Sequence, residues 1–283
     1  MGINEAFEHN ELDYGRKLYL IENCIYGVDI QPIAVQIAKM RFFISLIVDQ
    51  KIDDTQPNRG VRPLPNLETK FVAANTLIGI ERNVRQADFI TEDTAAHQKL
   101  KALREELAEA RHRHFIARTP ATKARCRERD RELRDKMSVL LAAAGFSAAH
   151  SRHLATWDPY DQNASANFFD AEWMFGVSEG FGITLGNPPY LSAVTMARDS
   201  ETKEQFQRRY PEASGAYDIY ILFILRGAQL IESNGVYCWI IPNRFLIADY
   251  AKKTKNALLE KFGLSWSVDV STFQVFEETS SIR

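Results

Sequence analysis

Residues 181–190 read FGITLGNPPY, and this segment sets the class of fold. Its first six residues form a mainly apolar run, which predicts a strand at 181–186. Pro188 and Pro189 cannot continue a parallel strand, because proline has no backbone N–H to donate. We therefore expect a rigid turn at the carboxyl end of the strand, which is where open α/β sheets bind their ligands.

Strand-like and helix-like segments alternate on both sides of this turn. Further strands are predicted at 24–30, 70–74, 236–242 and 264–270, and helices at 32–48, 218–233 and 249–262. The strands are apolar along their length, which indicates a parallel sheet covered by helices on both faces. The polar segments 50–66 and 156–167 predict loops. The fold class is therefore α/β.

The composition is that of a globular protein and excludes several other classes. The chain has 283 residues, of which 45% are hydrophobic and 25% charged, so it is neither disordered nor a fibrous repeat. Cys24, Cys126 and Cys238 are scattered and lack metal-site spacing, so we expect no bound metal and a reducing, cytoplasmic location. No apolar run approaches the ~20 residues that span a bilayer, and we expect no membrane association.

Residues 99–136 carry an excess of positive charge. They contain thirteen Lys or Arg and seven Asp or Glu, a local balance of +6 in a chain of net charge −2. Leucines at helical spacing and the Thr119-Pro120 step predict helices at 91–117 and 121–144, which would form an antiparallel hairpin. The arginines either follow a nucleic-acid phosphate backbone or form a solvated face of Glu–Arg pairs.

The predicted turn after the 181–186 strand is a candidate ligand site. It presents an amide side chain, a proline carbonyl and an aromatic ring to one cleft. The alternative is a strand-terminating turn with Tyr190 packed behind it. Asn187-Pro188-Pro189-Tyr190 resembles the catalytic motif of S-adenosylmethionine-dependent amino methyltransferases, especially those acting on the exocyclic amine of adenine in DNA.

This resemblance implies a catalytic role for Asn187, Pro188, Pro189 and Tyr190. The adenine amine is a poor nucleophile, because its lone pair is delocalised into the ring. Hydrogen bonds to the Asn187 side-chain oxygen and the Pro188 carbonyl would favour a pyramidal nitrogen aimed at the methyl group. The target base must leave the duplex, and Tyr190 is the expected stacking platform for it.

Two segments are expected to bind the S-adenosylmethionine cofactor. Asp29 ends a predicted strand and precedes a helix, which is where dinucleotide-type folds bind ribose hydroxyls, and Ile30 would pack on the adenine. The alternative is that Asp29 only caps the next helix. Asn75 follows the strand at 70–74, and by resemblance it would bind the adenine amine of the cofactor. An ordinary turn asparagine is the alternative.

The wider sequence resembles type II restriction–modification adenine methylases over about residues 18–283, apart from the hairpin. Endonuclease, methylase and target-recognition domains often share one polypeptide in that family, which implies double-stranded DNA as the partner. By the same resemblance, Phe276 would contact the flipped base, with core packing as the alternative. We expect residues 1–90 and 151–283 to form two parts of one methyltransferase domain, separated by an inserted helical hairpin at 91–150.

Two departures from the family pattern bear on the expected fold. Gly182 stands where family members usually carry Asp, and no glycine-rich cofactor motif precedes Asp29. We therefore expect an incomplete Rossmann-like fold, a fragment of a longer enzyme that binds S-adenosylmethionine weakly or not at all when isolated. Methylation of an amide or amine on protein or RNA is one alternative function, and a non-catalytic DNA-binding or assembly module is another.

Overall fold

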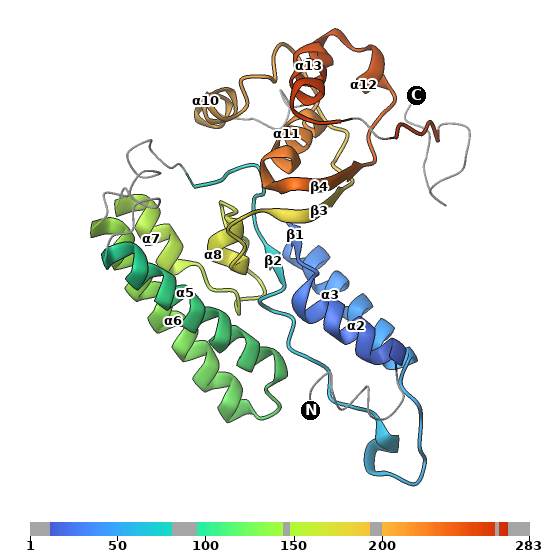
Figure 1. Ribbon diagram of the computed structural model, residues 1–283, viewed down its shortest axis with the longest axis vertical. Helices are drawn as coiled ribbons and strands as arrows, with labels where there is room; N and C mark the ends of the chain where they lie inside the picture. Colours follow the sequence, from blue (N-terminus) through green and yellow to red (C-terminus); the bar gives the residue numbers. More distant parts are fainter. Residues whose placement is uncertain (1–11, 81–94, 144–147, 193–199, 264–265, 271–283) are drawn as a thin grey trace. The chain divides into compact units, whose positions relative to one another are not determined.

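The structure is a computed structural model that describes residues 12–80, 95–143, 148–192, 200–263 and 266–270 (Figure 1). The chain divides into two compact units, Met1–Ser178 and Glu179–Arg283. Each unit contains one pair of parallel strands together with packed helices. The predicted mixed α/β class is therefore confirmed. No helix among the described residues has the length and apolar character needed to cross a membrane.

The first unit is built around strands β1 (Gly27–Asp29) and β2 (Phe71–Ala73), which run parallel with Asp29 opposite Ala73. Helix α3 (Pro32–Val48) packs on both strands, and helix α2 (Leu12–Asn23) packs on α3. Proline at the first position of α3 suits a helix start, because that residue's N–H would have no helical partner. The core of this unit includes the buried side chains of Tyr14, Ile21, Val35, Leu46, Leu67, Phe71 and Phe115.

The two predicted hairpin helices are present as α5 (Ala95–Ile116) and α6 (Pro120–Ala143), which lie side by side (Figure 1). The short helix α7 (Ala148–Thr156) packs on α6, and α8 (Ala171–Phe175) follows the loop predicted at 156–167. The hairpin belongs to the first compact unit. Its assignment as an insertion that splits one domain remains a prediction.

Asp130 anchors the hairpin within the first unit through a fully buried ion cluster. Its carboxylate accepts hydrogen bonds from Arg111 Nε at 2.7 Å and from Arg134 Nε at 2.6 Å. Arg111 also donates to the carbonyl oxygens of Trp173 and Met174 at 3.2 and 2.8 Å. Burial by itself would raise the pKa of Asp130, but the two guanidinium groups outweigh it and hold that pKa below its usual value. The cluster therefore joins α5 and α6 to the backbone of α8.

A second buried cluster joins the hairpin to the segment before β2. Asn66 Nδ2 donates to the carbonyl oxygens of His114 and Ala117 at 2.7 and 2.8 Å. Arg127 donates to His114 Nε2 at 3.3 Å and to Glu68 at 3.4 Å. Burial lowers the pKa of His114, and the positive charge of Arg127 adds to this while Glu68 opposes it. This histidine is therefore held neutral between charged neighbours.

The second unit consists of two parallel strands and the helices around them. Strand β3 (Phe181–Gly186) pairs with β4 (Ile231–Trp239), and helix α11 (Tyr220–Leu230) packs on both. The side chains that α11 buries are mostly large and apolar. The other elements among this unit's described residues are α10 (Ser200–Arg209), α12 (Arg244–Ile247), the 3-10 turn η2 (Asp249–Ala251) and α13 (Lys252–Lys261).

Three predicted elements of this unit differ from the structure. The helix predicted at 218–233 ends at Leu230, and β4 begins at Ile231 instead of 236. Between these two ends β4 contains an irregularity: Phe181 pairs with Ile231 and Ile183 pairs with Val236, so residues 232–235 of β4 stand opposite the single residue Gly182. A strand was predicted at 264–270, but the described residues 266–270 form none, since no described strand pairs with them. The helix predicted at 249–262 begins as a 3-10 turn.

Candidate active site

The turn that follows β3 is built on a close contact between Gly186 and Trp239. The Ile240 N–H donates to the Gly186 carbonyl at 3.0 Å, which extends the pairing with β4 to the end of the strand. A Cβ atom at Gly186 would lie only 2.1 Å from the indole of Trp239. A Cβ atom at Gly227 in α11 would lie 2.4 Å from the same indole. The ring therefore occupies a slot that only two glycines leave open, directly behind the Asn-Pro-Pro-Tyr turn.

The four residues of that turn differ in exposure. Pro188 is buried, whereas Asn187, Pro189 and Tyr190 are exposed or partly exposed. The Tyr190 hydroxyl lies 3.2 Å from the Asn187 side-chain oxygen and 3.3 Å from the Ile240 carbonyl, and it donates to these acceptors. Desolvation raises the pKa of Tyr190, so the hydroxyl keeps its proton and remains a donor. The tyrosine is 49% exposed and is fixed at its hydroxyl end.

A row of tyrosines supports the turn from behind. The Tyr190 ring meets the buried Tyr220 ring edge-on, with centroids 6.5 Å apart and planes at 88°. The Tyr220 and Tyr250 hydroxyls lie 2.9 Å apart, and Tyr250 donates to Asp218 at 2.9 Å. Ile219 N–H donates to the Leu191 carbonyl at 2.7 Å, which ties the chain just past the turn to the start of α11. The Tyr190 ring is therefore fixed by the hydrogen bonds of its hydroxyl and by its contact with the Tyr220 ring.

Sequence reasoning did not single out Asp218 and Tyr250. They are 32 residues apart, and neither lies in a recognisable motif. The structure places Tyr220 in the core, where its ring contacts that of Tyr190. The Asn187 oxygen can accept a second hydrogen bond, because a carbonyl oxygen has two lone pairs. The turn is thus able to receive an N–H group beside an exposed aromatic ring.

Asp29 and Asn75 come together in the first unit, at the carboxyl edge of the β1–β2 pair. The Ala74 N–H donates to the Asp29 carbonyl at 2.9 Å, directly before Asn75. Asp29 Oδ1 accepts from the Gln31 N–H at 2.8 Å, and Asn75 Oδ1 accepts from the Leu77 N–H at 3.1 Å, each across two residues. Asp29 does not cap α3, because Gln31 holds the N-cap position without a side-chain bond, whereas Asn75 has the bond of a turn asparagine. Asp29 is exposed, and so is its neighbour Ile30. The edge therefore presents a carboxylate next to an exposed apolar side chain.

Comparison with known families identifies the chain. The profile of the Eco57I restriction-modification methylase family matches residues 23–276, which is most of the sequence. The chain belongs to the Eco57I restriction-modification methylase family. Phe276, the last residue of that match, lies outside the described residues, so its expected contact with a base stays a prediction.

Relatives of this Eco57I-family chain are much longer proteins. It is 26% identical to a Methanocaldococcus jannaschii protein provisionally named a type II restriction enzyme and methyltransferase, over 83% of this chain and 23% of that protein. It is 31% identical to the Escherichia coli type II restriction enzyme and methyltransferase RM.Eco57I over 36% of this chain and 10% of the other. It is 26% identical to the Geobacillus stearothermophilus type II methyltransferase M.BstVI, over 34% of this chain and 17% of that protein. No solved structure shows a significant match.

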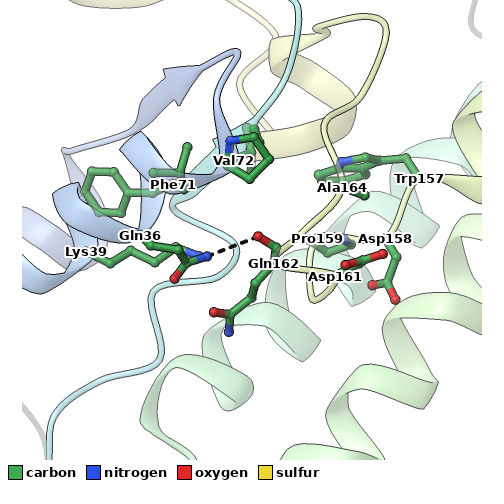
Figure 2. A pocket seen from close by; sticks show the side chains of 13 residues that line it. Gln36, Lys39, Phe71, Val72, Trp157, Asp158, Pro159, Asp161, Gln162 and Ala164 are labelled. Atoms are coloured by element: carbon green, nitrogen blue, oxygen red, sulfur yellow. Dashed lines mark hydrogen bonds between the residues drawn. The ribbon is translucent and has the colours of Figure 1, made fainter.

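One small pocket of the Eco57I-family chain does not suit a cofactor. It lies between α3, β2 and the loop at 157–164, and the Gln36 side chain donates across it to the Gln162 carbonyl at 3.4 Å (Figure 2). Its volume of about 20 Å³ holds no more than a water molecule. Lys39 lines it with a pKa lowered by burial. No group of three or more potential metal ligands occurs among the residues that the structure describes.

Proposed function

We propose that this chain is the methyl-transfer part of a DNA adenine methyltransferase that acts within a type II restriction–modification protein. Family membership and the names of the relatives support DNA methylation as the activity. The observation that carries the finer proposal is the exposed Tyr190 ring, whose hydroxyl bonds to the Asn187 amide at the end of β3. This arrangement offers an acceptor and a stacking surface to one flat, amine-bearing base.

In this proposal Asn187, Pro188, Pro189 and Tyr190 bind the adenine amine. The Asn187 oxygen and the Pro188 carbonyl accept its two N–H groups, and Tyr190 stacks on the base after it leaves the duplex. No strong general base is required before attack, because the amine is made reactive by position and by hydrogen bonding. Phe276 would provide a second aromatic contact.

Asp29, Ile30 and Asn75 would bind S-adenosylmethionine, which supplies a methyl group activated on a positively charged sulfur. The fit rests on three features of the β1–β2 edge. The second carboxylate oxygen of Asp29 has no partner among the described residues and is free to accept from a ribose hydroxyl. Ile30 is 56% exposed beside it and offers an apolar surface for a purine. The Asn75 side-chain oxygen accepts from the Leu77 N–H and has a second lone pair that could accept from the adenine amine of the cofactor.

The exposed faces of the second unit support a wider, Rossmann-like methyltransferase sheet. Ile183, Leu185 and Val236 of β3 and β4 are 65%, 75% and 59% exposed. Parallel sheets are normally covered on both faces, so this apolar surface is unusual for a finished sheet. We propose that other segments of the protein cover it and supply the glycine-rich cofactor strand. Tight stoichiometric binding of S-adenosylmethionine to the isolated chain, measured by calorimetric titration, would contradict this.

The activity is tested with Asn187→Ala in the intact protein. We expect methyl transfer to DNA to fall at least ~100-fold, as when a positioned hydrogen-bonding group is removed from an active site. The matched control is Asn256→Ala, since Asn256 is an exposed asparagine on α13 in the same unit and is not part of the turn. Labelled methyl groups are followed into plasmid DNA, RNA and protein. Retained DNA methylation in Asn187→Ala refutes the role of the turn, and label found only in RNA or protein refutes the substrate.

A further inference from the structure

The positive charge of the helical hairpin is confined to one end. We define the basic turn as residues 110–127, which contain six Lys or Arg, two His and no Asp or Glu. The two stems, residues 99–109 and 128–136, contain seven Lys or Arg and seven Asp or Glu and are neutral together. The whole +6 excess therefore lies in the basic turn, where α5 ends and α6 begins.

Ion pairs explain the charges of the stems. Arg131 pairs with Glu128 at 2.6 Å, and Arg129 pairs with Glu132 at 3.0 Å and with Glu106 on the other helix. These are exposed ion pairs of the kind found on solvated helix surfaces. Such a surface was one of two expectations for the arginines, and it describes the stems.

The basic turn differs in three of its six cations, because only Arg111, Arg113 and Arg127 are paired with a carboxylate among the described residues. The side chains of Arg118, Lys123 and Arg125 form no ion pair or hydrogen bond with any residue that the structure describes. Arg127 is fixed by hydrogen bonds to Glu68 at 3.4 Å and to His114 at 3.3 Å. Three unneutralised cations thus stand beside one that is fixed in place.

Two of the unpaired cations lie, with Arg127, at a hollow. Arg118, Lys123 and Arg127 line it together with Pro120 and Ala124, and its volume is about 300 Å³. The Thr119 hydroxyl accepts from the Thr122 N–H at 3.1 Å, so the first turn of α6 is fixed at the rim. The hollow is large enough for a phosphate group. Guanidinium groups bind phosphate through two parallel hydrogen bonds, which makes arginine well suited to this ligand.

We propose that the basic turn binds backbone phosphates of duplex DNA. The inference rests on the proposed function, because it supplies the contact that a DNA methyltransferase needs with its substrate. Backbone contact is favoured over base recognition, since Phe115, the one Phe, Tyr or Trp of the basic turn, is only 2% exposed, and the exposed His112 ring is paired with Glu22 at 2.8 Å. The same feature favours duplex DNA over single-stranded RNA, whose recognition depends on stacked bases. The contact contributes affinity without reading sequence.

The test is the salt dependence of DNA binding by the intact protein carrying both Arg118→Ala and Lys123→Ala. Removal of one phosphate-binding cation lowers the slope of log Kd against log salt by about 0.9, so removal of both lowers it by about 1.8. Binding is measured by fluorescence anisotropy of a labelled duplex over a series of salt concentrations. Unchanged thermal unfolding confirms that the variant is folded.

The matched control removes the same charge from a stem, through Lys99→Ala and Lys101→Ala. Both lysines are exposed and unpaired among the described residues. Lys99 is 17 residues before the end of α5, about 26 Å along the helix and well beyond the Debye length of ~8 Å. We expect the control to keep the wild-type slope. The charge-preserving double variant Arg118→Lys and Lys123→Arg should keep most of it.

Equal slopes for the Arg118/Lys123 variant and the wild type overturn the inference. So does an equal decrease in the stem control, which would show a general charge effect, or tighter binding of single-stranded RNA than of duplex DNA through the same residues. A failure of the proposed function looks different: the wild-type protein then transfers no methyl group to DNA at any salt concentration. The two failures are measured separately, because anisotropy does not require turnover.

Discussion

Gly186→Ala should both destabilise the protein and impair methyl transfer. Its new Cβ would lie 2.1 Å from Trp239, about 1.3 Å short of the 3.4 Å at which ordinary contacts begin. The indole cannot retreat, because the Gly227 backbone of α11 closes the opposite side of the slot. Overpacking of this kind costs about 1–3 kcal/mol, and we expect the upper part of that range. A shift of ~1 Å in the adjoining turn lowers a rate by about 100-fold.

The same strand provides the control. In Gly182→Ala the new Cβ meets only the tip of the exposed Glu232 side chain, at 3.1 Å, and that side chain can move away. The free energy of unfolding should change by less than about 0.5 kcal/mol. Urea unfolding followed by circular dichroism measures stability, and initial rates on saturating DNA measure turnover. Equal effects in the two variants, or full activity in Gly186→Ala, would refute the proposed role of the Trp239 slot.

Three further outcomes are expected. Asp130→Asn should reduce the free energy of unfolding by about 3–5 kcal/mol, because it leaves buried arginines uncompensated, whereas Glu128→Gln in an exposed pair should cost under ~1 kcal/mol in the same urea titration. The pKa of His114 is lowered in the folded protein, so below about pH 6.5 the unfolded chain binds more protons and the free energy of unfolding should fall as the pH decreases. His114→Gln should flatten this decline, and an unchanged pH profile of stability would contradict the reasoning. Tyr190→Ala should abolish DNA methylation, while Tyr190→Phe keeps the stacking surface and should retain most of it; equal rates would exclude stacking.

The parts of the fold that the sequence predicted correctly are those with local causes. The strand at 181–186 has the predicted bounds, because an apolar run ends there in two prolines that forbid further pairing. The helix at 32–48 likewise begins at a proline and is apolar along most of its length. The hairpin helices were recognisable because a Thr-Pro step separates two periodic segments. In each case the information lies within a few residues of the element's end.

The parts that escaped prediction depend on partners distant in the chain. The segment 266–270 has a strand-like pattern, but a strand needs a neighbour, and none of the described strands pairs with it. Asp130 binds Arg111 across 19 residues, and Tyr250 binds Asp218 across 32. The composition of the hairpin cannot show which of its many arginines form ion pairs with the buried Asp130. The excess of positive charge in the basic turn could have been counted from the sequence. Only the structure shows which of the hairpin's charges form ion pairs.

The indole slot also constrains how this chain can change over generations. Residues 186, 227 and 239 come from a strand, a helix and a second strand, yet they share one volume. A side chain at either glycine becomes acceptable only after Trp239 has been replaced by something smaller. The order of substitutions is therefore fixed: residue 239 must shrink first. Among relatives, we expect the residues at these three positions to change together.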